Sequence, residues 1–166
     1  MQNELPEGCR VCKGQEESTK HSTRVNFNRE YKNYIQDAKS MTDPVTGHID
    51  PDRFRMRYFD MRTSNICNFK CRSCNQEYSS QWQAENDRTG YDSTKGLRIV
   101  DITPNMPTSV INGVAENCED IQTAYFAGGE PLITDDHYTL LYALAERNPD
   151  CVLRYNTNLS NLNYKK

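Results

Sequence analysis

Three cysteines lie close together in this chain, at Cys67, Cys71 and Cys74. Thiolates are soft ligands that suit iron–sulfur clusters and zinc, and clustered thiols in a chain without an export signal indicate metal binding before disulfides. The spacing C-x3-C-x2-C allows a loop to hold three corners of a [4Fe–4S] cluster while one iron stays open to a small molecule. The alternative is a structural zinc ion, which needs a fourth ligand. His48 and His137 are the candidates, although neither lies in a zinc-knuckle arrangement.

Two later segments could bind a small molecule. Gly-Gly-Glu-Pro at 128–131 follows the apolar run 123–127, and Asn-Thr-Asn at 156–158 follows the run 151–155. Two glycines by themselves commonly mark only a tight turn. Whether these two segments could form one site depends on the strands and helices that position them.

Those elements alternate between strand and helix. Apolar runs predict short strands at 56–61, 97–102, 123–127 and 151–155, and helical periodicity predicts helices at 29–39, 76–86, 109–117 and 135–147. Within 76–86, Tyr78 and Trp82 share a face and are interpreted as core residues. This alternation predicts an α/β fold with parallel strands, whose ligands bind at the carboxyl ends of the strands. The cysteine loop and both later segments follow strands, so we expect all three to meet at one edge of the sheet.

Three stretches then resemble the signatures of the radical S-adenosylmethionine (radical SAM) superfamily, and most of all its twitch-domain members. Ser-Asn-Ile-Cys-Asn-Phe-Lys-Cys-Arg-Ser-Cys at 64–74 is similar to the cluster loop, 127–132 to the second signature and 155–159 to the third. The resemblance implies that 55–166 is the N-terminal half of a partial (β/α) barrel. It also implies that 1–54 is a small appendage, part of a twitch/SPASM-like auxiliary element. Because the family barrel usually has more strand–helix units, we expect the chain to be a fragment.

The resemblance implies two cofactors. A [4Fe–4S] cluster would be bound by Cys67, Cys71 and Cys74, and S-adenosyl-L-methionine would chelate the open iron. Gly128 and Gly129 lack side chains, so their backbone would approach the methionine end of that cofactor closely.

Three further cofactor contacts follow from the resemblance. Glu130 would accept a hydrogen bond from the ammonium group of the methionine end. Asn156 or Asn158, of which Asn158 is favoured, would bond the ribose or the carboxylate. Many relatives have an aromatic residue before the third cysteine; this chain has Ser73 there, so Phe69 is the candidate for the adenine contact.

Cys9 and Cys12 form a second pair near the N-terminus. With Glu16 and Arg24, their surroundings resemble the segment before the barrel in twitch relatives, where such cysteines help to hold an auxiliary iron–sulfur cluster. Such a cluster normally takes four thiolates. The pair is therefore either part of an auxiliary site completed by other residues or a half-site that binds nothing. A thioredoxin-like redox pair is not favoured, because no βαβ pattern surrounds it.

The composition limits the remaining classes. A formal net charge of −3 disfavours a general nucleic-acid binder, which needs a basic surface. No apolar run approaches the ~20 residues that cross a bilayer, and no signal-peptide core follows Met1, so we expect a cytoplasmic protein. Apolar residues make up only 36% of the chain, which agrees with a fragment.

We therefore predict a radical SAM enzyme, an oxidoreductase or transferase. It would cleave S-adenosyl-L-methionine reductively to a 5′-deoxyadenosyl radical that abstracts hydrogen from a substrate such as a peptide or protein. Flavodoxin or ferredoxin would supply the electron. The alternative is a zinc-binding structural or interaction module without catalysis.

Overall fold

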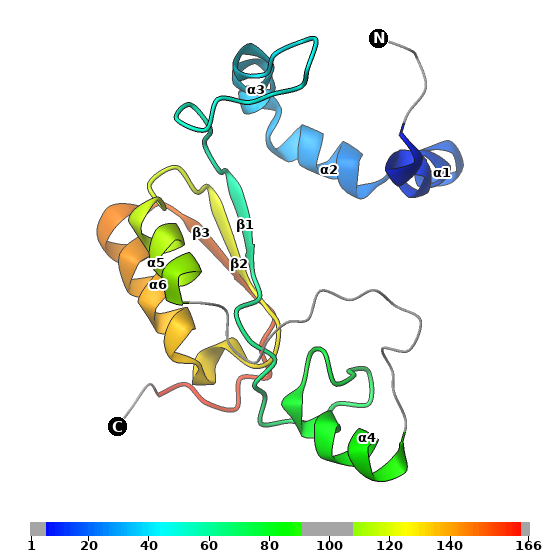
Figure 1. Cartoon of the computed structure of the whole chain (residues 1–166), viewed down its shortest axis with the longest axis vertical. Helices are drawn as coiled ribbons and strands as arrows, with labels where there is room; N and C mark the ends of the chain where they lie inside the picture. The colour runs from blue at the N-terminus through cyan, green and yellow to red at the C-terminus, as the bar shows by residue number, and fades with distance from the viewer. Residues whose placement is uncertain (1–5, 91–107, 164–166) are drawn as a thin grey trace. The chain divides into compact units, whose positions relative to one another are not determined.

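The computed structural model describes residues 6–90 and 108–163. It divides into two compact units, Met1–Phe54 and Arg55–Lys166, which are described separately (Figure 1). The strand expected at 97–102 lies outside the described residues.

The first unit is built from short helices. Their bounds are η1 Glu7–Cys9, α1 Arg10–Thr19, α2 Thr23–Glu30, η2 Lys32–Tyr34 and α3 Ile35–Met41. Ser22 caps α2, since its hydroxyl accepts a hydrogen bond from the Val25 amide at 3.0 Å. The single helix predicted at 29–39 is wrong, because α2 ends at Glu30 and the backbone of its C-cap, Tyr31, leaves the helical conformation with φ −103° and ψ 23°.

The second unit contains a parallel sheet of strand order β1-β2-β3 (Figure 1). The strands are β1 Tyr58–Met61, β2 Thr123–Phe126 and β3 Val152–Tyr155. Phe126 pairs with Met61 on one side and with Tyr155 on the other, so all three strands end at the same level. The predicted α/β fold with parallel strands is confirmed. The described strands form an open sheet, and no barrel is seen among them.

Helices follow the strands as alternation requires. Their bounds are η3 Ser80–Trp82, α4 Gln83–Thr89, α5 Thr108–Glu116, η4 Pro131–Ile133 and α6 Asp135–Arg147. The helices predicted at 109–117 and 135–147 are confirmed to within a residue. The helix predicted at 76–86 begins later, because the Tyr78 and Ser79 amides both donate to the Asn75 carbonyl in a turn. None of the described helices has the length and apolar character needed to span a membrane.

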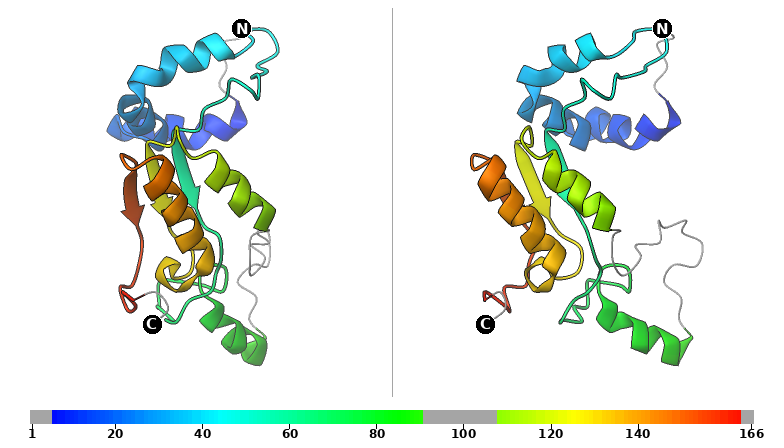
Figure 2. Two further views of the ribbon diagram at one scale, coloured as in Figure 1. Left: turned by 90° about the vertical axis from the view of Figure 1, so that its left-hand side faces the viewer. Right: turned by 60° about the vertical axis from the view of Figure 1, so that its left-hand side comes forward.

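The core lies between the sheet and the helix pair α5 and α6, which pack against each other (Figure 2). Its buried members are Met61, Ile111, Cys118, Ile121, Ala124, Phe126, Leu140 and Leu144. Ala124 and Phe126 alternate with outward residues along β2, so they point to the helix-covered face. This packing fixes the sheet and so the positions from which the loops after β1, β2 and β3 leave it.

Candidate metal and cofactor site

A cavity of about 440 Å³ lies where the loops after the three strands meet. All eight residues of the second unit that the sequence assigns to a cluster or cofactor line this cavity: Cys67, Phe69, Cys71, Cys74, Gly128, Gly129, Glu130 and Asn158. The expected meeting of three segments at one edge of the sheet is therefore observed.

Side chains that follow the cysteine loop hold its backbone in place. The Ser79 hydroxyl, which is almost fully buried, donates to the Phe69 carbonyl at 2.7 Å. The Trp82 indole N–H donates to the Cys71 carbonyl at 3.2 Å. Trp82 is thus a support of the cysteine loop rather than the core residue that its helical spacing predicted.

The three thiols differ in exposure. Cys67 is buried, Cys74 is half-buried and Cys71 is exposed. The Phe69 amide donates to the Cys67 sulfur at 3.4 Å, a contact of the kind that tunes metal-bound thiolates. Burial, and then the neighbouring Cys71 and Cys67 thiols, raise the pKa of Cys74 above that of a free thiol.

The arrangement of these thiols can be compared with the two metal sites that the sequence allows. No group of three or more His, Cys, Asp or Glu side chains in the described parts of the chain could hold a single metal ion. Cys67, Cys71 and Cys74 instead line the wall of one cavity. A zinc ion needs every thiolate about 2.3 Å from one point. In a cubane cluster each cysteine binds a different iron, so its thiolates do not have to meet at one point.

The two glycines allow the loop before Cys67 to approach the end of β2. A Cβ atom on Gly129 would lie 2.1 Å from the Ile66 carbonyl oxygen, and one on Gly128, whose φ is +104°, would lie 2.8 Å from that of Ser64. The Gly129 amide donates to the Ser64 carbonyl at 2.9 Å, and the Glu130 amide donates to that of Ile66 at 2.8 Å. The structure therefore gives a reason for both glycines that the sequence did not, and their contact with a cofactor stays a prediction.

Glu130 is buried and ties the end of β2 to the loop after β3. Its Oε1 accepts from the Leu132 amide at 3.1 Å and from the Thr157 hydroxyl at 2.6 Å. Its Oε2 accepts from the Asn158 amide at 2.7 Å. A carboxylate has about four acceptor positions. One acceptor position on Oε2 is therefore not used by these three bonds, which give Glu130 a positioning role that the sequence did not reveal.

The Asn158 side chain is already engaged at the rim of the cavity. Its Nδ2 donates to Asn68 Oδ1 at 3.0 Å, and its Oδ1 accepts from the Ser160 amide at 2.9 Å. The predicted bond from Asn158 to a ribose or carboxylate would therefore compete with these contacts. Its neighbour Asn156 also lines the cavity.

The sequence reasoning missed other lining residues, of which Arg62 and Tyr78 are the most distinctive. Arg62 donates to Asp60 through Nε at 2.8 Å and through Nη2 at 3.0 Å. Its guanidinium carbon lies 5.8 Å from the centre of the Tyr78 ring. Tyr78 is 38% exposed, so its interpretation as a core residue is wrong. The position of Arg62 directly after β1 was the available signal.

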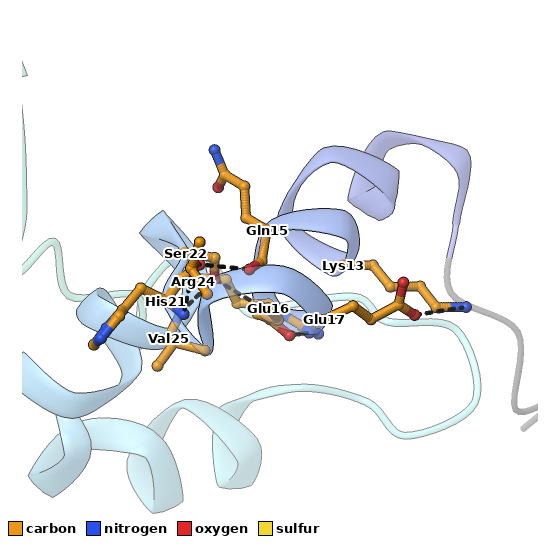
Figure 3. A network of polar contacts seen from close by, with 9 residues as sticks. Lys13, Gln15, Glu16, Glu17, His21, Ser22, Arg24 and Val25 are labelled. Atoms are coloured by element: carbon orange, nitrogen blue, oxygen red, sulfur yellow. Dashed lines mark hydrogen bonds and ion pairs between the residues drawn. The ribbon is translucent and has the colours of Figure 1, made fainter.

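Cys9 and Cys12 lie in the first unit, where Cys9 is the N-cap of α1 and Cys12 lies in its first turn. The adjoining polar network is centred on Glu16, which accepts from Ser22 Oγ at 2.6 Å and from Arg24 Nε at 3.0 Å (Figure 3). Bonds to Glu16 raise the pKa of Arg24, and the two thiols contribute to the same shift. These contacts do not distinguish between the two interpretations of the pair, so both stay open.

Comparisons of this chain with protein-family models, with curated proteins and with solved structures find no match. The chemistry of the cavity must therefore be inferred from its own residues. Three thiols, two adjacent glycines and a buried carboxylate line this one cavity. Thiols are soft metal ligands, and a concave site with a few polar groups can bind a small molecule.

Proposed function

We propose that this chain is part of a radical SAM enzyme, with a [4Fe–4S] cluster and S-adenosyl-L-methionine bound side by side in the cavity. One observation carries the proposal. The cysteine loop, the Gly-Gly-Glu turn and the Asn-Thr-Asn segment are far apart in the sequence, yet all of them line one cavity. Its volume of about 440 Å³ falls within the range of about 300–1,000 Å³ for small-molecule sites.

The residues of the chain have distinct parts in this proposal. Cys67, Cys71 and Cys74 hold the cluster, and the Phe69 amide stabilises negative charge on the Cys67 sulfur. Glu130 offers its remaining Oε2 position to the ammonium group of the methionine end. Burial of this carboxylate strengthens such a bond, because water does not compete for it.

When bound, the cluster supplies one electron to the sulfonium of S-adenosyl-L-methionine, whose cleavage gives the radical that takes hydrogen from a substrate. Flavodoxin or ferredoxin is the proposed electron donor, and a peptide or protein is the proposed substrate class. The protein residues bind and orient the two groups.

The first test is metal content after anaerobic reconstitution with iron and sulfide. We expect about four irons and about four sulfides bound by the cavity thiols of each chain. Cys71→Ala should lose them, whereas Cys151→Ala should not, since Cys151 is a half-buried cysteine that does not line the cavity. One tightly bound zinc without sulfide would favour the zinc-binding module instead.

The second test concerns the cofactor. Addition of S-adenosyl-L-methionine should change the electron paramagnetic resonance spectrum of the dithionite-reduced cluster, because the cofactor would bind to the open iron. Formation of 5′-deoxyadenosine, measured by mass spectrometry, would show cleavage. A reduced cluster whose spectrum is unchanged by saturating cofactor would contradict the proposal.

A further inference from the structure

Side-chain hydrogen bonds join the cysteine loop to the loop after β3. Asn68 lies between Cys67 and Phe69, and its side-chain amide both donates and accepts a hydrogen bond. Its Nδ2 donates to the Ser160 hydroxyl at 2.6 Å, and its Oδ1 accepts from Asn158 Nδ2 at 3.0 Å. The Asn158 Oδ1 in turn accepts from the Ser160 amide at 2.9 Å. These three side chains, Asn68, Asn158 and Ser160, are called the rim latch below.

The rim latch connects two walls of the same cavity. Cys67 and Phe69, which flank Asn68, line it from one wall, and Asn158 lines it from the other. Buried Glu130 holds the Asn158 amide at 2.7 Å, so the wall after β3 is anchored to the end of β2. Asn68 therefore links the first cysteine of the metal loop to a wall that the fold already fixes.

We infer that Asn68 is a positioning residue, which acts through Asn158 and Ser160 to set the distance between the cysteine loop and the loop after β3. This inference rests on the proposed function, in which S-adenosyl-L-methionine lies between these two walls. A wall that is fixed before binding leaves less conformational entropy to be lost on binding. Asn68, which does not line the cavity itself, should thus raise affinity for the cofactor without contacting it.

Two substitutions of Asn68 should differ in the hydrogen bonds that they leave in the rim latch. Asn68→Leu keeps a side chain of similar size but removes both hydrogen bonds. Asn68→Asp keeps both, because its carboxylate oxygens can accept from Asn158 Nδ2 and from the Ser160 hydroxyl, which can rotate to donate. Asn112→Leu is the matched control, since Asn112 is exposed on α5 and does not line the cavity.

The first measurement needs no metal. Hydrogen exchange of the metal-free chain should be about tenfold faster at the Cys67 amide in Asn68→Leu, as expected when bonds worth about a factor of ten are lost. The Cys67 amide donates to Ser80 Oγ in the wild type, whereas the Asn158 amide, which Glu130 Oε2 holds without Asn68, should keep its wild-type rate. Exchange should stay at the wild-type rate in Asn68→Asp. Unchanged exchange in Asn68→Leu would overturn the rim latch.

The second measurement uses the chain reconstituted with iron and sulfide. Asn68→Leu should bind S-adenosyl-L-methionine about tenfold more weakly at unchanged iron content, and Asn68→Asp should bind it within about twofold of the wild type. A purely structural defect would instead lower the iron content as well. Equal affinity in Asn68→Leu, or a loss in Asn68→Asp as large as in Asn68→Leu, would refute the positioning role.

The two measurements separate failure of the inference from failure of the proposed function. If the wild-type chain assembles no cluster, the proposed function fails and the affinity role of Asn68 fails with it. Hydrogen exchange then still decides whether the rim latch holds the two loops. If the wild type binds both groups and Asn68→Leu does too, only the inference is lost.

Discussion

Gly129→Ala should test the close approach on which the cavity depends. A Cβ atom at this position would lie 2.1 Å from the Ile66 carbonyl oxygen, whereas ordinary contacts begin at 3.4 Å. The two atoms must therefore separate by 3.4 − 2.1 = 1.3 Å. The neighbour is backbone, so no flexible side chain can move away instead.

The cost of that separation follows from the bonds that it breaks. Displacing the Ile66 carbonyl lengthens its 2.8 Å bond from the Glu130 amide beyond hydrogen-bond range, and the adjacent 2.9 Å bond from Gly129 to Ser64 is strained with it. Each such bond contributes about 1 kcal/mol net. Residual crowding adds about 1–3 kcal/mol. We expect a loss of about 3–5 kcal/mol, a large fraction of the stability of a typical domain.

Urea denaturation of the metal-free chain measures this loss. Gly113→Ala is the matched control, because a Cβ atom there meets nothing within 4 Å and Gly113 lies in α5. An alanine in that helix should stabilise the chain by up to about 1 kcal/mol. The alkylation rate of Cys67, which is only 8% exposed, should rise in Gly129→Ala alone, as followed by mass spectrometry of the modified peptide.

One result would refute this reasoning. If Gly129→Ala unfolded within about 1 kcal/mol of the wild type and left the alkylation of Cys67 unchanged, the loop before Cys67 would not pack against the end of β2. The cavity would then lack the wall that the structure gives it.

Three further predictions concern buried charge and the second cysteine pair. Burial lowers the pKa of His137 below its usual 6.5. As the pH drops below about 6.5, the unfolded state therefore takes up a proton before the folded state does, and the free energy of unfolding should fall. His137→Gln should reduce this pH dependence, measured as the urea midpoint. Glu130→Gln should cost about 1–3 kcal/mol in urea denaturation, because an amide cannot accept all three bonds, whereas exposed Glu146→Gln should change little. If Cys9 and Cys12 hold an auxiliary cluster, replacing both by alanine should lower the iron content of the reconstituted chain while the cavity cluster remains; equal iron would indicate a half-site.

Local pattern was sufficient for the elements that end at the cavity. The apolar run before Gly128 and the leucines of α6 have strand and helix periodicity in their own residues, so β2 and α6 could be predicted closely. Parallel pairing followed from alternation, which also placed the cysteine loop at a strand end. Where periodicity was weak, as around Tyr31, the predicted helix was wrong.

The sequence by itself determined which chemical groups are available, namely three soft thiols within eight residues and the two later segments that accompany them. Only the tertiary structure decided how these residues are held. Gly129 is needed because of the Ile66 carbonyl, and Asn68 meets Asn158 across 90 positions of sequence. Such contacts depend on where two loops cross, and the spacing of residues within either loop does not encode that crossing.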